Sequence, residues 1–383
     1  MNNKLKITIA VVITAVITFT LTNVLNGSLQ VLDNVKMKEA MTVFSYTYNG
    51  DVPDREAMTD GAISGILKLT NDPYTNYYNK EDFKRYLEDV QGNFVGLGVV
   101  VTLDNDGYVT VVAPYEDTPA YRAGMLTGDK IIKVDGEDLN GNLDRAVYLM
   151  KGQDLKNPEG TDVVVTIRRE GMADFDVTMT REVIHVKSVT SHMLDDGVGY
   201  LKITSFDEDT DEEFEENVKS LQKSGMSKLV IDLRNNPGGD FDVVCKIADS
   251  LLGESVITYT ENKKGEKVYQ RSDAEMIDCP VAVLINQGSA SASEVLTGAL
   301  KDNKRAVVVG ETSYGKGIVQ SVFKLSDGSG MSVTTDKYFT PSGVCIHGIG
   351  IQPDVEVQME ITAIQPDSKD DIQLQKAIEM LLQ

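Results

Sequence analysis

A repeated pattern of apolar run, small-residue turn and helix occupies the second half of this 383-residue chain and most limits how it can fold. The apolar runs at 228–234, 280–286 and 306–310 each have the length of one buried strand. Turns rich in glycine or serine follow the first two runs, at 235–240 and 287–291, and helical patterns begin directly after them. This alternation predicts an α/β layer in which functional groups gather at the strand ends.

Three serines follow the second apolar run, and a lone lysine lies further along between two glycines. Ser289, Ser291 and Ser293 stand where a strand ends and a helix begins, so the positive end of the helix dipole stabilises an alkoxide that forms there. Lys316 lies at the start of a strand, and burial in an apolar site lowers the pKa of a lysine because the cation loses its hydration. The pattern therefore suits a serine nucleophile with a lysine as general base.

Two neighbouring features complete this candidate site. A strand has a period of two residues, which places Lys316, Ile318 and Gln320 on one face and lets the Gln320 amide hold the lysine amine. Asn-Pro-Gly-Gly at 236–239 ends another strand with amides that are free to bind an oxyanion. The loss of one such donor typically costs about 3 kcal/mol of transition-state stabilisation. Taken singly, each feature also has an ordinary interpretation as a helix cap, a surface turn or a chain reversal.

Composition narrows the alternatives. With only three histidines, His185, His192 and His347, a zinc site is not expected, although a Ser-His-Asp triad that uses one of them stays open. The three cysteines are scattered and predict neither a metal site nor a disulfide framework. The formal net charge of −22 argues against nucleic acid or an anionic membrane surface as a partner of the folded body. No metal or other cofactor is predicted.

The N-terminus carries an apolar run at 7–25, behind Lys4 and Lys6. As a helix this run rises roughly 28 Å, just enough to cross the hydrocarbon core of a bilayer. No Ala-x-Ala-like cleavage site follows it, which favours an uncleaved anchor over a removable signal peptide. Positive charges before the run place the N-terminus in the cytoplasm. We therefore expect a single-pass protein of the cell membrane whose main body is extracytoplasmic.

Short strands and glycine turns follow from residue 92, with three motifs in order. They are Gly-Leu-Gly-Val at 96–99, Pro-Ala-x-x-Ala-Gly at 119–124 and Gly-Asp-x-Ile-x-x-Val-Asp-Gly at 128–136. Together they resemble a PDZ domain over residues 92–181. Such a domain pairs an extended peptide with a sheet edge, and the amides of its glycine loop cradle the terminal carboxylate. The predicted peptide-binding residues are Gly96, Leu97, Gly98 and Val99.

The second half of the chain resembles the carboxy-terminal processing peptidases, also called tail-specific proteases. The resemblance rests on Asp-Leu-Arg-x-Asn-Pro-Gly-Gly at 232–239, on Asn-x-Gly-Ser-Ala-Ser-Ala-Ser-Glu at 286–294, and on the Gly-Lys-Gly-x-Val-Gln motif that ends 310–320, where Ser313 replaces the usual threonine. It implies a nucleophile, a base and a glutamine that follows the base, at Ser291, Lys316 and Gln320. The oxyanion donors that it implies are the amides of Gly238 or Gly239 and of Ala292.

The same resemblance implies an α/β fold with a crotonase-like catalytic core, an inserted PDZ domain, and helical N- and C-terminal segments that mediate homodimer formation. The predicted boundaries are 1–27 for a cytoplasmic stub and transmembrane anchor, 28–91 for the N-terminal helical segment, 92–181 for the PDZ domain, 182–355 for the peptidase core and 356–383 for the C-terminal helical segment. In relatives the PDZ domain can block or organise the active site until a tail binds. Arg168 and Arg169 are candidates for a coupling contact.

The predicted function is a serine endopeptidase that recognises apolar C-terminal tails through its PDZ domain and cleaves through an acyl-enzyme. One alternative is a catalytically silent PDZ scaffold that only binds peptides, against which the intact serine, lysine and glutamine count. Another is a crotonase-type acyl-CoA enzyme, against which the PDZ domain and the missing acidic pair for enolate chemistry count. The expected partner is a protein or peptide with an apolar C-terminus, and the physiological substrate is left open.

Overall fold

The computed structural model describes residues 35–91, 93–104, 106–115, 117–153, 155, 157–359 and 370–383. The predicted cytoplasmic stub and membrane anchor lie outside these residues. Across the part that is described, no helix combines the length and the apolar character needed to cross a membrane. The chain divides into two compact units, Met1–Ile66 and Leu67–Gln383.

The first unit contains the helix α2 and nearly all of the helix α3. They span Val35–Thr47 and Arg55–Lys68, and neither has a buried residue. The apolar side chains of Val35, Val43 and Tyr46 are 67%, 61% and 86% exposed. The N-terminal segment is thus helical in its described part, and its role in dimer formation stays a prediction.

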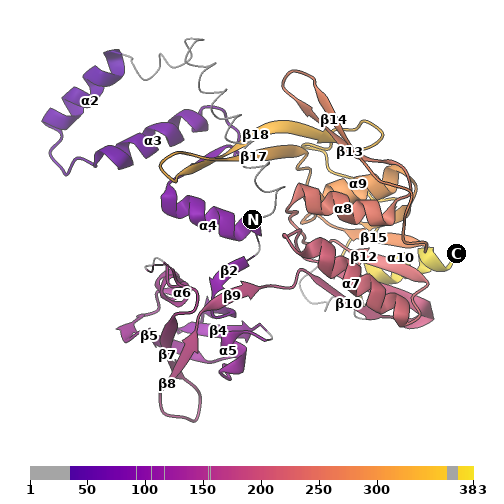
Figure 1. Ribbon diagram of the computed structural model, residues 1–383, viewed down its shortest axis with the longest axis horizontal. Helices are drawn as coiled ribbons and strands as arrows, with labels where there is room; N and C mark the ends of the chain where they lie inside the picture. Colours follow the sequence, from indigo (N-terminus) through magenta and orange to yellow (C-terminus); the bar gives the residue numbers. More distant parts are fainter. Residues whose placement is uncertain are drawn as a thin grey trace. The chain divides into compact units, whose positions relative to one another are not determined.

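A small β domain with its own core occupies the region where the PDZ motifs lie (Figure 1). Its main sheet has the order β3-β4-β5-β7-β8, with β6 beside β5, and β2 pairs separately with β9. The strands are β2 (Asn93–Gly96), β3 (Val99–Leu103), β4 (Val109–Pro114), β5 (Lys130–Val134), β6 (Glu137–Asp138), β7 (Asp162–Arg168), β8 (Phe175–Thr180) and β9 (Glu182–His185). The helices are α5 (Pro119–Arg122) and α6 (Leu143–Lys151). The strand β3 lies at an edge of this sheet, and within the described residues it pairs only with β4.

The predicted α/β layer is a six-stranded sheet of order β10-β11-β12-β15-β16-β19. Only β10 runs antiparallel to its neighbour in this sheet, so the carboxyl ends of the other strands meet at one edge. The strands are β10 (Val189–Met193), β11 (Val198–Ile203), β12 (Lys228–Asp232), β15 (Val281–Ile285), β16 (Ala306–Gly310) and β19 (Val355–Glu356). The helices are α7 (Thr210–Lys223), α8 (Phe241–Leu251), α9 (Ala292–Asp302) and α10 (Ile372–Leu382).

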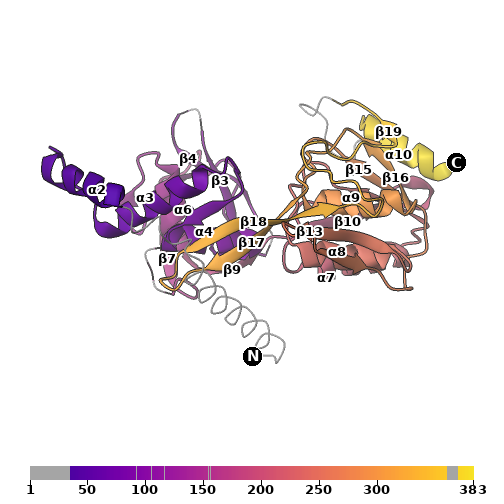
Figure 2. The ribbon, with the colours of Figure 1, turned by 90° about the horizontal axis from the view of Figure 1, so that it is seen from above.

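Helices cover both faces of this sheet, and the alternation of side chains along each strand explains how. Val283 and Ile285 of β15 pack in the cluster that contains α7, α8 and α9, whereas Ala282 and Leu284 pack in the cluster that contains α10. Figure 2 shows α10 on one side of the sheet and α7 and α8 on the other. Because both faces of the sheet are buried, each strand needs apolar residues at successive positions, which explains the continuous apolar runs in the sequence.

The predicted C-terminal helix is present, and its apolar side covers the sheet of its own chain. Leu374, Ala377 and Leu381 are buried there. The apolar side chains of α10 thus cover one face of the sheet, because that face has to be shielded from water. A role of this helix in dimer formation stays a prediction.

A second sheet carries the loop of the candidate lysine. Its order is β1-β18-β13-β14, and β17 pairs with β18 as a long hairpin (Figure 1). The strands are β1 (Asn76–Tyr78), β13 (Val256–Asn262), β14 (Lys267–Arg271), β17 (Ile318–Lys324) and β18 (Gly330–Phe339). The helix α4 (Lys80–Gln91) follows β1, so a stretch that precedes the β domain in sequence joins the same sheet as β17.

Candidate active site

The serine-rich turn joins the carboxyl end of β15 to the start of α9. Ser291 is the last residue before the helix and has φ of 54° and ψ of −114°, a backbone conformation that glycine tolerates and that other residues adopt at a cost of about 1–3 kcal/mol. Its N–H donates to the Oε2 atom of Glu294 at 2.9 Å, which helps to hold this conformation. The turn therefore places Ser291 at the predicted strand–helix junction, in a strained conformation held by surrounding contacts.

The three serines of the turn are used differently. The Ser289 hydroxyl donates to the Leu233 carbonyl at 2.8 Å, and the Ser293 hydroxyl donates to the Asn236 carbonyl at 3.0 Å. Both serines are fully buried, whereas Ser291 is partly exposed. Ser289 and Ser293 thus fasten the turn to the neighbouring loop, and Ser291 is the serine of the three that a substrate can reach.

The glycine loop that follows β12 packs directly against this turn. A Cβ atom on Gly238 would lie 2.8 Å from the Cβ of Ser291 and 2.9 Å from the N of Ala292. Gly238 and Gly239 have φ of 105° and 145°, which side chains disfavour. These glycines are therefore required by both the close approach and the backbone conformation.

The amides of this loop differ in availability. The Gly238 N–H donates to Asn236 Oδ1 at 2.8 Å. In contrast, the N–H groups of Gly239 and Ala292 have no acceptor among the residues that the structure describes. The sequence left the choice between Gly238 and Gly239 open, and the hydrogen bonds favour Gly239, with Ala292, as the candidate oxyanion donors.

A buried glutamate ties the serine turn to the lysine loop. The side chain of Glu294 is fully buried, and Oε2 accepts hydrogen bonds from the N–H groups of Ser291 and Lys316 at 2.9 and 2.8 Å. Its Oε1 accepts from the Ser313 hydroxyl and from the Gly315 N–H at 2.8 Å. Sequence reasoning missed this role, although a glutamate three residues after a serine at a helix start is the signature of a capping box.

Tyr338 of β18 reinforces the same connection. Its hydroxyl contacts the carbonyl oxygens of Ser291, at 2.9 Å, and of Lys316. Burial raises the pKa of Tyr338 well above its usual range, so this hydroxyl stays protonated and can donate. Two side chains from different elements thus hold the serine and lysine backbones together.

Lys316 lies in the loop just before β17, with its amine partly removed from water. Burial lowers the pKa of Lys316 below its ordinary value, as the sequence predicted for a base. Its Nζ lies 4.7 Å from the centre of the Tyr74 ring. Within the described parts of the chain it forms no ion pair, so the ring is the cation's principal close neighbour.

Gln320 is the third residue of β17, the strand that follows the lysine loop. The strand β17 begins at Ile318, and a bulge interrupts its register between Val319 and Gln320. The extra residue of this bulge is Thr335 of β18, so the alternation along β17 itself is kept. Lys316 lies before the first residue of β17, however, and the period of the strand does not by itself fix the direction of the lysine side chain. The Gln320 amide instead approaches the Ile318 carbonyl at 3.5 Å. Its role toward the lysine stays a prediction.

The alternative of a triad that uses one of the three histidines gains no support. His185 faces Asp209 at 3.6 Å on the surface, His192 packs against the Tyr200 ring, and the His347 side chain is exposed. Asp232, at the end of β12, is a structural partner of Arg234. The Arg234 guanidinium pairs with Asp232 and with Asp371, the N-cap of α10, each at 2.7 Å. No group of ligands that could hold a metal ion occurs among the described residues.

The candidate peptide-binding loop lies between β2 and β3. Gly98 has φ of 69°, and its carbonyl accepts hydrogen bonds from the Tyr115 N–H and the Thr118 hydroxyl at 2.9 and 3.0 Å. The Leu97 side chain is buried in the apolar cluster that includes Ala146 and Leu149 of α6. The loop therefore stands at the start of an unpaired sheet edge, beside an apolar helix face.

The two arginines proposed for coupling are engaged within the β domain. Arg168 forms paired hydrogen bonds to Asp174 at 2.9 and 2.7 Å, and Arg169 does the same with the buried Asp129 at 2.7 Å. The neighbouring guanidinium lowers the pKa of Asp174 and helps to lower that of Asp129. A coupling role for either arginine would require these pairs to open.

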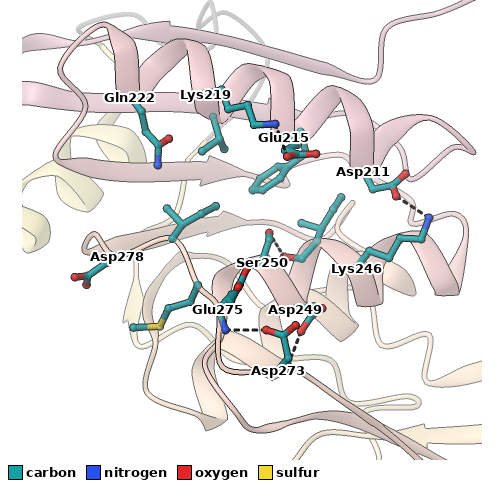
Figure 3. A pocket seen from close by; sticks show the side chains of 15 residues that line it. Asp211, Glu215, Lys219, Gln222, Lys246, Asp249, Ser250, Asp273, Glu275 and Asp278 are labelled. Atoms are coloured by element: carbon teal, nitrogen blue, oxygen red, sulfur yellow. Dashed lines mark hydrogen bonds and ion pairs between the residues drawn. The ribbon is translucent and has the colours of Figure 1, made fainter.

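A cavity of about 490 Å³ lies away from the candidate catalytic residues (Figure 3). It is bounded by α7, α8 and the stretch 273–278, and its rim carries an ion pair between Lys246 and Asp211 at 2.7 Å. None of Ser291, Lys316 or Gly239 lines it. The catalytic candidates lie instead at the serine turn, the glycine loop after β12 and the loop before β17.

Three regions of the chain match described protein families. Residues 197–357 match peptidase family S41, residues 110–169 match a PDZ domain, and residues 21–82 match the N-terminal domain of the activating protease CtpB. A carboxy-terminal-processing protease of Bartonella bacilliformis is 39% identical over 320 residues, 81% of this chain and 72% of that protein. A probable CtpA-like serine protease of Staphylococcus aureus is 40% identical over 309 residues, 79% of this chain and 61% of that protein.

Solved structures agree with these matches. A photosystem II D1 C-terminal processing protease resembles the chain with a TM-score of 0.52 and 29% identity over 92% of both chains. A putative S41 protease from Bacteroides fragilis has a TM-score of 0.55 over 87% of this chain and 92% of that one, and at 14% identity this likeness shows the fold alone. The chain therefore belongs to the S41 family of serine peptidases, with relatives among the carboxy-terminal processing proteases, and it carries a PDZ domain.

Proposed function

We propose that this peptidase is an endopeptidase in which Ser291 is the nucleophile and Lys316 the general base. The observation that carries the proposal is the buried carboxylate of Glu294, which accepts hydrogen bonds from the N–H groups of both residues at 2.9 and 2.8 Å. One fixed group thereby holds two loops that are separate in sequence. Positioning of this kind is what a nucleophile and its base need in order to react as a pair.

The proposed reaction begins when the neutral Lys316 amine takes the proton of the Ser291 hydroxyl and Oγ attacks the scissile carbonyl. The carbonyl oxygen becomes an oxyanion, to which the N–H groups of Gly239 and Ala292 donate. Collapse of this intermediate breaks the C–N bond, passes the lysine proton to the leaving amine and leaves an acyl ester on Ser291. Water then hydrolyses the ester, with the lysine again as base. The lowered pKa of Lys316 makes more of the neutral amine available at a given pH.

Gln320 is our proposed partner for the lysine amine. Its amide lies 3.5 Å from the Ile318 carbonyl, a weak contact that is easily exchanged. A side-chain rotation at Gln320 would replace this contact with one to the Lys316 amine.

We further propose that apolar C-terminal tails bind at the loop of residues 96–99. The tail would extend the sheet at the edge strand β3, and its last side chain would enter the apolar cluster formed by Leu97, Ala146 and Leu149. The Gly98 carbonyl points toward Thr118. The terminal carboxylate would therefore bind on the opposite side of the loop, to its backbone N–H groups.

The remaining expectations stay proposals of the same kind. We propose a crotonase-like core, a membrane anchor at 7–25 with the main body outside the cytoplasm, and a homodimer that uses the N-terminal helices. The anchor is supported by the apolar run behind two lysines. The dimer is supported by the exposed apolar side chains of α2, which monomeric proteins rarely leave uncovered.

The test is cleavage of an unfolded protein that ends in an apolar tail, with wild-type enzyme, Ser291→Ala and Lys316→Ala. Ser342→Ala and Lys324→Ala, both exposed positions, are the matched controls. We expect cleavage by the wild type and both controls, and a loss of at least about 1000-fold in each catalytic variant. Mass spectrometry of the wild-type enzyme during turnover should reveal the acyl ester.

Each other outcome has a clear meaning. Full activity of Ser291→Ala would remove Ser291 as nucleophile, and full activity of Lys316→Ala would remove the lysine base. Tail binding by the wild type without any cleavage, at any tail concentration, would favour the peptide-binding scaffold.

A further inference from the structure

An aromatic ring from a distant part of the sequence lies against the candidate base. Tyr74 precedes the β domain in sequence, yet the centre of its ring lies 4.7 Å from Nζ of Lys316. This distance is within the range of roughly 6 Å over which a cation is attracted to the face of an aromatic ring. Desolvation makes the attraction stronger, and Lys316 is partly buried.

The turn that carries Tyr74 is rigidly built. The carboxylate of Asp72 accepts hydrogen bonds from the Tyr74 N–H at 2.9 Å and from the Thr75 hydroxyl at 2.7 Å. The pKa of Asp72 is lowered because these hydrogen bonds outweigh its partial burial. At ordinary pH the turn is therefore held by a charged acceptor.

The same turn is fastened to β18, the strand that pairs with β17. The Ser332 hydroxyl donates to the Tyr74 carbonyl at 3.0 Å, and the Thr334 N–H donates to the Thr75 hydroxyl oxygen at 3.0 Å. Asn76 then pairs with Ser332 at the start of β1. Because β17 begins two residues after Lys316, Tyr74 is held in position against the sheet that also bears the lysine loop.

We propose that Tyr74 is a positioning residue of the catalytic centre, and that the face of its ring holds the Lys316 ammonium and sets how readily it gives up its proton. The proposal rests on the role of Lys316 proposed above. No ion pair competes for the ammonium within the described residues, so the ring is the group that can fix the end of a long, otherwise mobile side chain.

Several titratable groups surround the amine and have to be considered with it. The Tyr74 hydroxyl interacts with Tyr314, and this interaction together with burial raises the pKa of Tyr74 to about 12, so the ring stays neutral. Glu294 and Tyr338 approach from α9 and β18, and both bind the backbone of Lys316. The backbone of His347 packs against Gly317, next to Lys316. None of these replaces the ring as a partner of Nζ.

The ring acts on the lysine in a direction that can be derived. Burial disfavours the ammonium and lowers its pKa, whereas a ring face favours the ammonium and raises it. A leucine at position 74 keeps the site apolar but removes the ring, so the pKa of Lys316 should fall by about half to one unit. A phenylalanine keeps the ring and should leave this pKa nearly unchanged.

The first experiment measures the pKa of Lys316 directly, by NMR of lysine labelled at Cε, in full-length Ser291→Ala protein. Lys316→Arg assigns the signal. We expect the pKa to fall in Tyr74→Leu and to stay within about 0.2 units in Tyr74→Phe, an order of magnitude set by the small change in ring electrostatics. An unchanged pKa in a folded Tyr74→Leu protein would overturn the proposal. This readout does not depend on cleavage, so it stands apart from failure of the proposed function.

A second series covers the case in which Tyr74→Leu does not fold. Phenylalanine with one, two or three fluorine atoms, placed at position 74, weakens the negative ring face in steps at almost constant size. We expect the acidic limb of kcat/KM to move to lower pH with each fluorine. A loss of activity with no movement of that limb would show a purely structural role and would also overturn the proposal.

Discussion

The glycine loops of the PDZ domain and of the peptidase core look similar in sequence but are built in different ways. Gly98 of the PDZ loop is held by Tyr115 and Thr118, which belong to the same small domain. Gly238 of the core loop lies against Ser291, which comes from the next strand–turn–helix unit of the sheet. The conformation of the PDZ loop depends on contacts within its own small domain. The core loop reaches its conformation only when two strand–turn–helix units of the sheet pack against each other. Damage to the core loop should therefore affect catalysis more than damage to the PDZ loop affects binding.

Among residues that do not themselves react, the largest effect is expected at Glu294, the group that crosslinks the catalytic loops. In Glu294→Gln an amide N–H₂ faces backbone N–H donors in place of a carboxylate oxygen, which we expect to cost about 3 kcal/mol of stability. Activity should fall by at least about 100-fold, since both reacting groups shift. Thermal unfolding and cleavage kinetics measure the two effects.

Glu213→Gln is the matched control. The carboxylate of Glu213 also accepts backbone hydrogen bonds, from the N–H groups of Ser188 and Val189 at 2.8 and 2.9 Å, but away from the serine turn. It should lose stability and keep its activity per folded molecule. Equal losses of activity in both variants would mean that Glu294 acts only through global stability.

A smaller effect is expected from Gly238→Ala. The added Cβ would lie 2.8 Å from the Cβ of Ser291, closer than carbon atoms normally approach, so the loop or the turn has to move. We expect kcat/KM to fall by about 100-fold. Gly265→Ala is the control, because Gly265 has φ of 80° with open space around it and so imposes the same kind of backbone strain without the clash. Retained activity in Gly238→Ala would contradict the packing argument.

The corresponding change in the PDZ loop should act on binding. In Gly98→Ala the new Cβ would lie 2.3 Å from the Cβ of Thr118, which forces the loop to move. We expect the affinity for an apolar C-terminal peptide, measured by calorimetry with Ser291→Ala protein, to fall about tenfold. Gly171→Ala has positive φ without a neighbour and should bind normally. If Gly98→Ala binds as tightly as Gly171→Ala, the tail does not use this loop.

The smallest effect is a dependence of stability on pH that arises in the core. Burial lowers the pKa of Lys316 in the folded protein below the ordinary value of 10.5, which the unfolded chain keeps. At a pH between the folded-state pKa and 10.5, the unfolded chain therefore binds more protons than the folded one. Stability therefore rises with pH across that window, and the cost of the buried lysine is full below it. In Ser291→Ala protein, Lys316→Met should be more stable by about 1 kcal/mol at pH 7, with a gain that shrinks toward pH 10.

Lys324→Met, on the exposed end of β17, should show no such trend with pH. Denaturant titrations at three pH values make the comparison. If the gain in stability of Lys316→Met stays constant with pH, the charge of the buried Lys316 does not destabilise the folded protein.

Local sequence determined much of this molecule. The apolar runs predicted the strands β12, β15 and β16, because a strand covered by helices on both faces must be apolar throughout. The three ordered glycine motifs predicted the PDZ domain, and the serine turn was correctly placed before α9. Glycines at positive φ and serines at a helix start are constraints between neighbouring residues, so they can be recognised in the sequence alone.

Tertiary structure decided what those motifs contact. Packing between segments far apart in the chain decided several features. They are the bulge in β18 opposite Gln320, the burial of α10 against its own sheet, the engagement of the Gly238 amide but not, among the described residues, of the Gly239 amide, and the approach of Tyr74 to Lys316. Glu294 is the clearest case. It has the appearance of a helix cap in the sequence, and only the fold brings the backbone of Lys316 to the same carboxylate. Hydrogen bonds of this kind depend on which loops meet in space, and no local preference encodes that meeting.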